Sequence, residues 1–207
     1  SGLYCYKPLF FMNEINWNFK NTYSNLSNSF KQDINPIPVK NPELILLNKN
    51  LASLLDLDFS KISNQELSKI FSGNSLPEGT KSIAQAYAGH QFGHFTILGD
   101  GRAVILGEHI NENNNRYDIQ LKGSGKTPYS RNGDGKATLG PMIREYLISE
   151  AMHHLNIPST RALAVITTGE NIYREKIEPG AVLVRVAKSH LRVGTFQFGS
   201  LLKDTKE

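Results

Sequence analysis

The chain has 207 residues, of which 39% are hydrophobic, so it is long enough to bury a core and form a domain. Its 23 lysines and arginines exceed its 19 aspartates and glutamates by four, and this excess is scattered over most of the chain, which argues against a dedicated nucleic-acid-binding protein. The single cysteine, Cys5, excludes an intramolecular disulfide and a cysteine-based zinc site, and no apolar run reaches the ~18 residues of a membrane span. We therefore expect a cytoplasmic protein without a membrane or nucleic-acid partner.

Residues 1–40 are predicted to form an extended amino-terminal arm. From residue 12 onward this segment is rich in Asn, Ser and Lys, with scattered aromatic residues. We expect the arm to dock on the rest of the protein through aromatic side chains. These are Trp17, Phe19, Tyr23 and Phe30.

Residues 41–94 are predicted to form a helical segment. The stretch NPELILLNKNLASLLDLD favours a helix because Pro42 suits a first turn and leucines recur at helical spacing. A second helix is predicted for SNQELSKIFSG, where Ser63 and Glu66 form a capping box and Gly73 ends the helix. We expect both helices to serve packing.

Residues 95–207 are predicted to form a separate lobe. Two strand-like runs, RAVILGE and YDIQLKG, flank a predicted hairpin loop, and a glycine-rich loop follows them. The stretch PMIREYLISEAMHHLN is helical, and two further strands are ALAVITT and AVLVRVAK. This order predicts an α+β fold with a small, mainly antiparallel sheet and one helix packed against it.

Two glycine turns in this lobe are candidate ligand contacts. Gly99 and Gly101 lack side chains, so their backbone N–H groups could approach an anion, and Arg102 adds a forked positive charge suited to phosphate. Asp134 and Gly135 form a second turn, which could be a second wall of a nucleotide site. Ordinary turns between strands have the same composition, so a purely structural role is the alternative for both.

Lys122 and Glu145 are candidates for an ion pair at the site. A lysine at the end of a strand beneath a glycine-rich turn can reach phosphates as a point charge, although a solvated strand end is the alternative. Glu145 lies almost in line with Met152 on a partly apolar helix face, where a carboxylate requires a cation such as Lys122. A glutamate at the edge of an apolar stripe is the alternative.

Two arginines follow in the last predicted strand and beyond it. Arg185 shares a strand face with Ala181 and Leu183, so its guanidinium requires an anion or a carboxylate there. Arg192 follows beyond a predicted turn. Ordinary salt bridges on a sheet face are the alternative for these arginines.

The order of these parts is that of a protein-kinase amino-terminal lobe: glycine turn, strand, strand lysine and helix glutamate. Four stretches resemble the SelO (selenoprotein O-like, YdiU) family, and the resemblance covers roughly residues 15–200. They are YAGHQFGHFTILGDGRAVILGE, DIQLKGSGKTPYSRNGDGKA, IREYLISEAMHHLNIPSTRAL and VLVRVAKSHLRVGTFQF. The resemblance implies a pseudokinase-fold protein adenylyltransferase that binds ATP and transfers AMP to Ser, Thr or Tyr hydroxyls of proteins. A related UMP transfer with manganese is attributed to some bacterial members.

The same resemblance implies the roles of individual residues. Arg185 and Arg192 match two arginines that hold phosphates, and Glu145 matches the helix glutamate that orients Lys122. The implied nucleotide contacts are Gly99, Gly101, Arg102, Lys122, Asp134, Gly135, Arg185 and Arg192. Lys136 stands where the family often has arginine, which keeps the charge but loses the fork.

Family members are much longer than this chain. The resemblance implies that the catalytic aspartate and the ligands of Mg²⁺ or Mn²⁺ lie in a second lobe beyond residue 207, so we expect no catalytic base and no metal ligand among these residues. Residues 95–207 would then be an ATP-binding lobe that is inactive alone. Two alternatives remain open: a non-catalytic nucleotide- or phosphate-binding module, and an RNA-contacting domain. The lack of a basic stretch interleaved with aromatic residues speaks against RNA.

Overall fold

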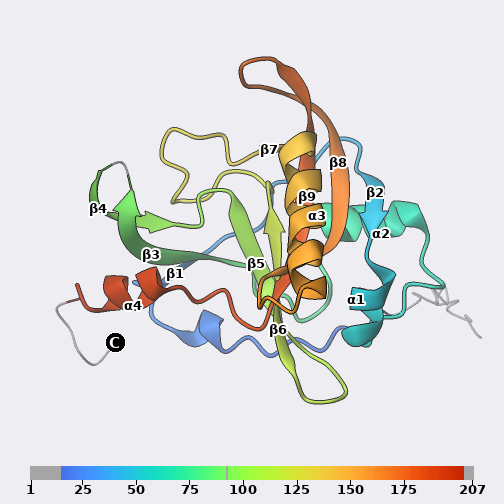
Figure 1. Ribbon diagram of the computed structural model, residues 1–207, viewed down its shortest axis with the longest axis horizontal. Coiled ribbons are helices and arrows are strands. Elements are labelled where there is room, and N and C mark those ends of the chain that lie inside the picture. Colours follow the sequence, from blue (N-terminus) through green and yellow to red (C-terminus); the bar gives the residue numbers. More distant parts are fainter. Residues whose placement is uncertain (1–14, 92, 203–207) are drawn as a thin grey trace, which may run out of the picture.

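A single antiparallel sheet organises the protein (Figure 1). The structure, a computed structural model, describes residues 15–91 and 93–202. The strands are β1 (Lys31–Asp33), β2 (Glu43–Leu47), β3 (Ile83–Gln91), β4 (His94–Gly99), β5 (Ala103–Ile110), β6 (Arg116–Lys122), β7 (Ala137–Thr138), β8 (Arg161–Tyr173) and β9 (Ile177–Ala187). Their order is β1-β3-β5-β6-β9-β8-β2, with β4 paired to β3 and β7 paired to β9. The predicted α+β class and antiparallel pairing are confirmed, but the prediction of a small sheet is wrong, because nine strands join it.

Helices cover both faces of this sheet. They are η1 (Tyr23–Asn25), α1 (Lys49–Leu54), α2 (Asn64–Ser72), α3 (Leu139–His154) and α4 (Val193–Gly199). Helices α1 and α2 pack on one face and α3 packs on the other (Figure 1). In the part of the chain that the structure describes, no helix is long and apolar enough to cross a membrane.

Strand β9 shows how the sequence separates the two faces. Val182, Val184 and Val186 belong to the core cluster that includes α1 and α2, whereas Ala181 and Leu183 pack with Met142 of α3. This is the alternation expected of a strand buried on both faces. Arg185 therefore lies on the same face as Ala181 and Leu183, as predicted, and this is the face that α3 covers.

The helix predicted over residues 41–58 is only partly correct. Residues 43–47 form the edge strand β2, which pairs with β8, and α1 begins at Lys49 after the cap residue Asn48. The apolar run LILL fits a half-buried strand as well as a helix, and pairing with β8 decides between them. Strand β3 also falls in the segment predicted to be helical. Helix α2 has the predicted capping box of Ser63 and Glu66.

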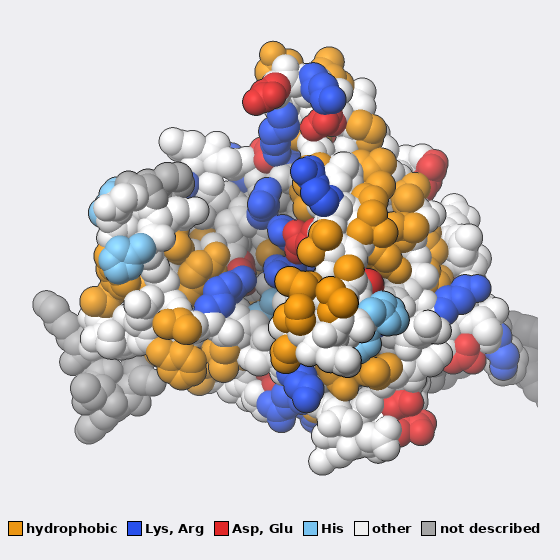
Figure 2. Space-filling model, viewed as in Figure 1, with side chains coloured by type: hydrophobic (Ala, Val, Ile, Leu, Met, Phe, Trp, Pro, Cys, Tyr) orange, Lys and Arg blue, Asp and Glu red, His pale blue; other side chains and the backbone are white. Residues whose placement is uncertain are grey.

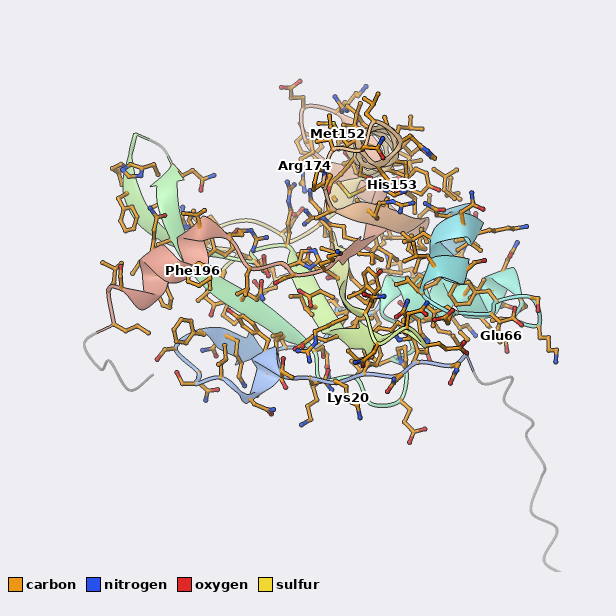
Figure 3. All side chains as sticks on the ribbon, turned by 60° about the horizontal axis from the view of Figure 1, so that its bottom comes forward. Lys20, Glu66, Met152, His153, Arg174 and Phe196 are labelled. Atoms are coloured by element: carbon orange, nitrogen blue, oxygen red, sulfur yellow. The ribbon has the colours of Figure 1, made fainter. Side chains whose placement is uncertain are left out.

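Several apolar side chains on the helices face outward. Figure 2 shows hydrophobic side chains exposed along α3, where Leu147 and Ile148 are 59% and 58% exposed. Phe196 of α4 is 70% exposed and lies at the opposite end of the molecule from Glu66 of α2 (Figure 3).

Residues 15–40 of the predicted amino-terminal arm dock through aromatic residues, as predicted, whereas residues 1–14 lie outside the described residues. Trp17 and Phe19 stack with their ring centroids 5.2 Å apart, and both rings meet His109 edge-on. Phe30 packs edge-on against Phe198 of α4. The arm therefore contacts β5 through His109 and α4 through Phe198.

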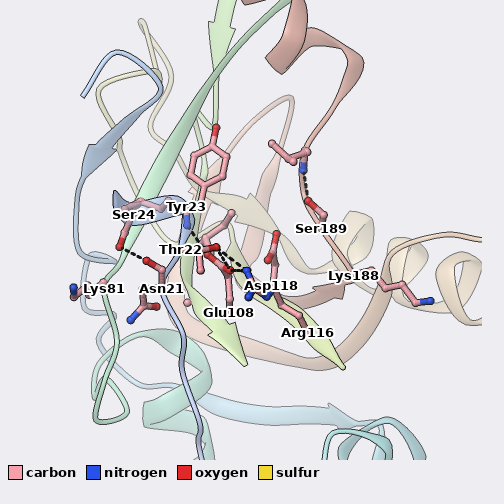
Figure 4. A pocket seen from close by; sticks show the side chains of 14 residues that line it. Asn21, Thr22, Tyr23, Ser24, Lys81, Glu108, Arg116, Asp118, Lys188 and Ser189 are labelled. Atoms are coloured by element: carbon pink, nitrogen blue, oxygen red, sulfur yellow. Dashed lines mark hydrogen bonds and ion pairs between the residues drawn. The ribbon is translucent and has the colours of Figure 1, made fainter. Parts of the chain in front are cut away.

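A buried carboxylate, Glu108 of β5, fixes the middle of the arm. Its oxygens accept hydrogen bonds from Thr22 Oγ1 at 2.6 Å, from the backbone N–H of Tyr23 at 2.6 Å and from Arg116 at 2.7 Å. These groups line a cavity of about 150 Å³ (Figure 4). Because the Glu108 side chain is only 6% exposed, its charge depends on these donors.

Replacing Glu108 by Gln tests this anchor. Gln keeps the size of the side chain but loses the charge that strengthens its hydrogen bonds, so we expect the free energy of unfolding to fall by about 1–3 kcal/mol. Urea denaturation measures this value. An unchanged unfolding free energy would contradict the anchoring role.

Candidate functional site

Strand β6 places polar side chains on the face of the sheet that α3 covers. Asp118, Gln120 and Lys122 alternate with Ile119 and Leu121, which point into the opposite, apolar core. Asp118 is 7% exposed and Gln120 is fully buried. Buried polar groups are unfavourable unless each finds a partner, so this face requires a connected network.

Glu145 of α3 is the first element of that network. It forms an ion pair with Lys122, and its other oxygen lies 3.1 Å from Arg185 Nε, at ion-pair distance but without hydrogen-bond geometry. Burial lowers the pKa of Lys122, and the hydrogen bond and charge of Glu145 oppose that shift. Burial also lowers the pKa of Arg185, again against the charge of Glu145. One carboxylate thus pairs with two largely buried cations and offsets only part of their charge.

Asp100 of the first glycine turn is the second element. Its carboxylate is 3% exposed and lies 3.2 Å from Arg192, whose guanidinium also stacks 4.3 Å above the ring of Tyr87. Burial raises the pKa of Asp100, and the positive charge of Arg192 opposes the shift. The Arg192 side chain keeps 33% of its surface exposed.

Gln120 connects these two elements. Its Oε1 accepts a hydrogen bond of 2.8 Å from Arg185, and its Nε2 lies 3.5 Å from the carboxylate of Asp100. A continuous polar chain therefore runs from Lys122 to Arg192. The structure brings together the three cations that the sequence analysis drew from distant parts of the chain, with Glu145 between two of them.

The other predicted site residues line a neighbouring groove of about 640 Å³. They are Gly99, Gly101, Arg102, Asp134 and Gly135. Figure 2 shows Lys and Arg side chains gathered around the hollow beside α3. Tyr87 joins the groove to the polar network, because it lines the groove and its ring packs on Arg192.

Two backbone N–H groups of the glycine turn form hydrogen bonds within the protein and are not open to an anion. The backbone N–H of Asp100 donates to Gln85 O at 2.9 Å, and that of Gly101 donates to Gly99 O at 2.8 Å, so both are engaged within the protein. The space beside the glycines is taken by Tyr129: a Cβ at Gly99 would lie 2.2 Å from its ring. The glycines therefore allow the loop that contains Tyr129 to approach the turn. They also leave this wall of the groove without side chains.

The second glycine turn is also held by neighbours. Asp134 receives two hydrogen bonds from Arg174, of 2.8 and 2.9 Å, which lower the pKa of its carboxyl. Arg174, labelled in Figure 3, lies in the turn between β8 and β9. At Gly135 a Cβ would lie 2.0 Å from the carbonyl oxygen of Gly125, so only glycine lets these two parts of the loop cross.

Sequence reasoning missed the residues that hold the cations in place. Asp100 lies between the two glycines that were predicted as contacts, and Gln120 lies two residues before Lys122, but neither was among the predicted site residues. The signal for Gln120 was present, since Asp118, Gln120 and Lys122 alternate with apolar residues. The packing of Tyr87 on Arg192 had no local signal.

The described residues do not fit a divalent metal ion. Across residues 15–91 and 93–202, no group of three or more His, Cys, Asp or Glu side chains is arranged to hold one. The acidic groups of the site are instead paired with cations. Chemically, the arrangement can bind an anion at the exposed edges of Lys122, Arg185 and Arg192.

Comparison with known proteins shows the family to which this chain is similar. The family model described as protein adenylyltransferase SelO matches residues 13–207. The chain is 67% identical over 184 residues to the protein nucleotidyltransferase YdiU of Pelagibacter ubique, covering 89% of this chain and 38% of the relative. It is 60% identical over 187 residues to the YdiU protein of Brevibacillus brevis, covering 90% and 38%. It is 58% identical over 191 residues to the YdiU protein of Nitrosococcus oceani, covering 92% of this chain and 39% of the relative.

The chain thus spans between 38% and 39% of the length of these three relatives. The resemblance found in the sequence motifs is confirmed, and it concerns the amino-terminal part of the relatives. Since the family model matches residues 13–207, the chain belongs to the SelO family.

Proposed function

We propose that this chain is the ATP-binding part of a protein nucleotidyltransferase that transfers AMP from ATP to Ser, Thr or Tyr hydroxyls of proteins. Membership of a family whose relatives are named protein nucleotidyltransferases supports the reaction class. The three cations of the site, Lys122, Arg185 and Arg192, support the proposal that the ligand is a nucleotide. A cytoplasmic setting is part of this proposal.

The observation that carries the proposal is the convergence of Lys122, Arg185 and Arg192 on one polar network. Three cations held this close repel one another, and two carboxylates offset only part of that repulsion. A triphosphate would supply the remaining negative charge. Arg185 and Arg192 would then bind phosphate oxygens through their forks, and Lys122 through its point charge.

The arrangement supports the proposal of a kinase-like amino-terminal lobe. A glycine turn precedes β5, Lys122 ends the adjacent strand β6, and Glu145 on the helix packed over the sheet pairs with that lysine. Protein kinases use the same order of parts to hold and orient phosphates. The groove beside the turn, lined by Gly99, Gly101 and Arg102, would receive the rest of the nucleotide.

In this proposal Mg²⁺ or Mn²⁺ would neutralise phosphate charge during transfer. Because the described residues do not fit a metal ion, its ligands would come from the portion that the longer relatives possess. The task of these residues is to bind and orient the triphosphate.

Replacing Lys122 by Ala in the full-length protein tests the proposal. We expect AMP transfer from radiolabelled ATP to fall by at least about 100-fold, because one phosphate-binding charge is lost. The fold should persist, since Glu145 keeps Arg185 as a partner. Circular dichroism checks the fold, and Lys69→Ala on α2 is the control, because Lys69 is an exposed lysine on the opposite face of the sheet.

Unchanged AMP transfer in the Lys122→Ala protein would contradict the proposal. If the wild-type protein binds ATP but transfers no AMP to any protein hydroxyl, a non-catalytic nucleotide-binding module is the correct function instead. Titration with ATP, with and without Mg²⁺, separates these results.

The pH dependence of ATP binding provides a second test. ATP affinity should fall as the pH rises through the lowered pKa of Lys122, because the neutral amine no longer attracts phosphate. Glu145→Gln removes the group that raises this pKa, so the fall should begin at a lower pH than in the wild type. We suggest calorimetric titration from about pH 7 to about pH 10 in the full-length protein.

The control for this experiment is Glu150→Gln. Glu150 lies on the same helix and binds Arg161 through contacts of 2.6 and 2.7 Å, away from Lys122. Its variant should follow the wild-type pH curve. Coincident curves for the wild type and Glu145→Gln would show that Glu145 does not control the charge of Lys122.

A further inference from the structure

Asp100 is a buried carboxylate in an unusual place, between two glycines of a turn. It is 3% exposed, and burial of its charge costs free energy that a neutral residue in the turn would avoid. A buried charge is tolerated when it is paired with groups that it holds in place. The partners of Asp100 therefore indicate its role.

The side chain of Asp100 faces two groups of the cationic network. Oδ1 lies 3.2 Å from Arg192, and Oδ2 lies 3.5 Å from Gln120 Nε2 and accepts a hydrogen bond of 3.3 Å from the backbone N–H of Gln85. Gln120 in turn accepts a hydrogen bond from Arg185. One carboxylate thus contacts one arginine directly and a second through a single side chain.

Backbone contacts hold the turn independently of this carboxylate. The N–H of Asp100 donates to Gln85 O at 2.9 Å, and its carbonyl accepts a hydrogen bond of 2.7 Å from Thr127 Oγ1. The carbonyl of Gly101 accepts one from Ser130. Because these bonds already fix the turn, the Asp100 carboxylate is not required to shape it.

The guanidinium of Arg192 is enclosed on several sides. Asp100 lies at one edge, the ring of Tyr87 covers one face at 4.3 Å, and the carbonyl of His190 accepts a hydrogen bond of 3.4 Å. The remaining 33% of the Arg192 side-chain surface is exposed. An arginine held in this way has lost much of its rotamer freedom before a ligand arrives.

We propose that Asp100 is a positioning residue of the nucleotide site, whose carboxylate fixes the guanidinium of Arg192 directly and that of Arg185 through Gln120 for contact with phosphate. This inference rests on the proposed function, because it assumes that both arginines bind ATP. Asp100 itself does not touch the nucleotide. Its negative charge would repel phosphate, and its burial keeps it away from the groove.

The test is a double-mutant cycle on ATP binding in the full-length protein. The dissociation constant of ATP is measured by calorimetry for the wild type, Asp100→Asn, Arg192→Ala and the combination of the two. We expect Asp100→Asn to weaken binding about tenfold, as removal of a group that orients a ligand-binding side chain does elsewhere. In the Arg192→Ala protein the same change should weaken binding by clearly less than about tenfold, because the direct partner is gone and only the contact through Gln120 to Arg185 remains.

The control is Glu108→Gln. Glu108 is a carboxylate of similar burial on the same sheet, and it pairs with Arg116 instead of a site arginine. This variant should lose stability but keep the wild-type dissociation constant for ATP. If a general loss of stability weakened ATP binding, the dissociation constant would rise in both variants. If Asp100 positions the arginines, the dissociation constant rises only in Asp100→Asn.

Two results would overturn the inference while leaving the proposed function intact: a wild-type dissociation constant for Asp100→Asn, or full additivity of the two changes. Absence of ATP binding by the wild type would instead overturn the proposed function, and the inference with it.

If Asp100→Asn does not fold by circular dichroism, Gln120→Met replaces it in a cycle with Arg185→Ala. Gln120→Met removes the bridge to Arg185 at similar volume, and it should weaken ATP binding only while Arg185 is present.

Discussion

The balance of charge on one face of a sheet governs this structure. Lys122, Arg185 and Arg192 lie in one polar network under α3 and the glycine turn, where mutual repulsion and loss of water both disfavour them. Glu145 and Asp100 offset that cost only in part. The three cations thus have two carboxylates as direct ion-pair partners, and an anionic ligand would relieve the charge that these partners leave over.

The rest of the fold explains how the chain maintains such a site. The opposite face of the same strands is a continuous apolar core beneath α1 and α2. That core and the docked aromatic arm provide the packing that offsets a polar face. Helix α3 then has two tasks, because Met142 packs on the sheet while Glu145 reaches into the polar network.

The sequence allowed the prediction of strands β5, β6, β8 and β9 and of helix α3, because strict alternation and spacing are local signals. It also predicted that Glu145 needs a cation such as Lys122, and the structure pairs the two. It did not allow the prediction of β2, because the spacing of its leucines fits a helix as well as a strand and only pairing with β8 decides between them. Nor did it allow the prediction of the size of the sheet. The engagement of the glycine turn by Tyr129 and the partners of Asp100 depend on contacts between distant segments. Such contacts leave no pattern in a single sequence.

The central claim is that Lys122, Arg185 and Arg192 bind one triphosphate together. A crystal structure of the full-length protein with a non-hydrolysable ATP analogue tests it most directly. The account predicts phosphate oxygens within hydrogen-bond distance of all three side chains, at about 2.7–3.2 Å. Triphosphate bound elsewhere, with these three cations still satisfied only by Glu145 and Asp100, would contradict it.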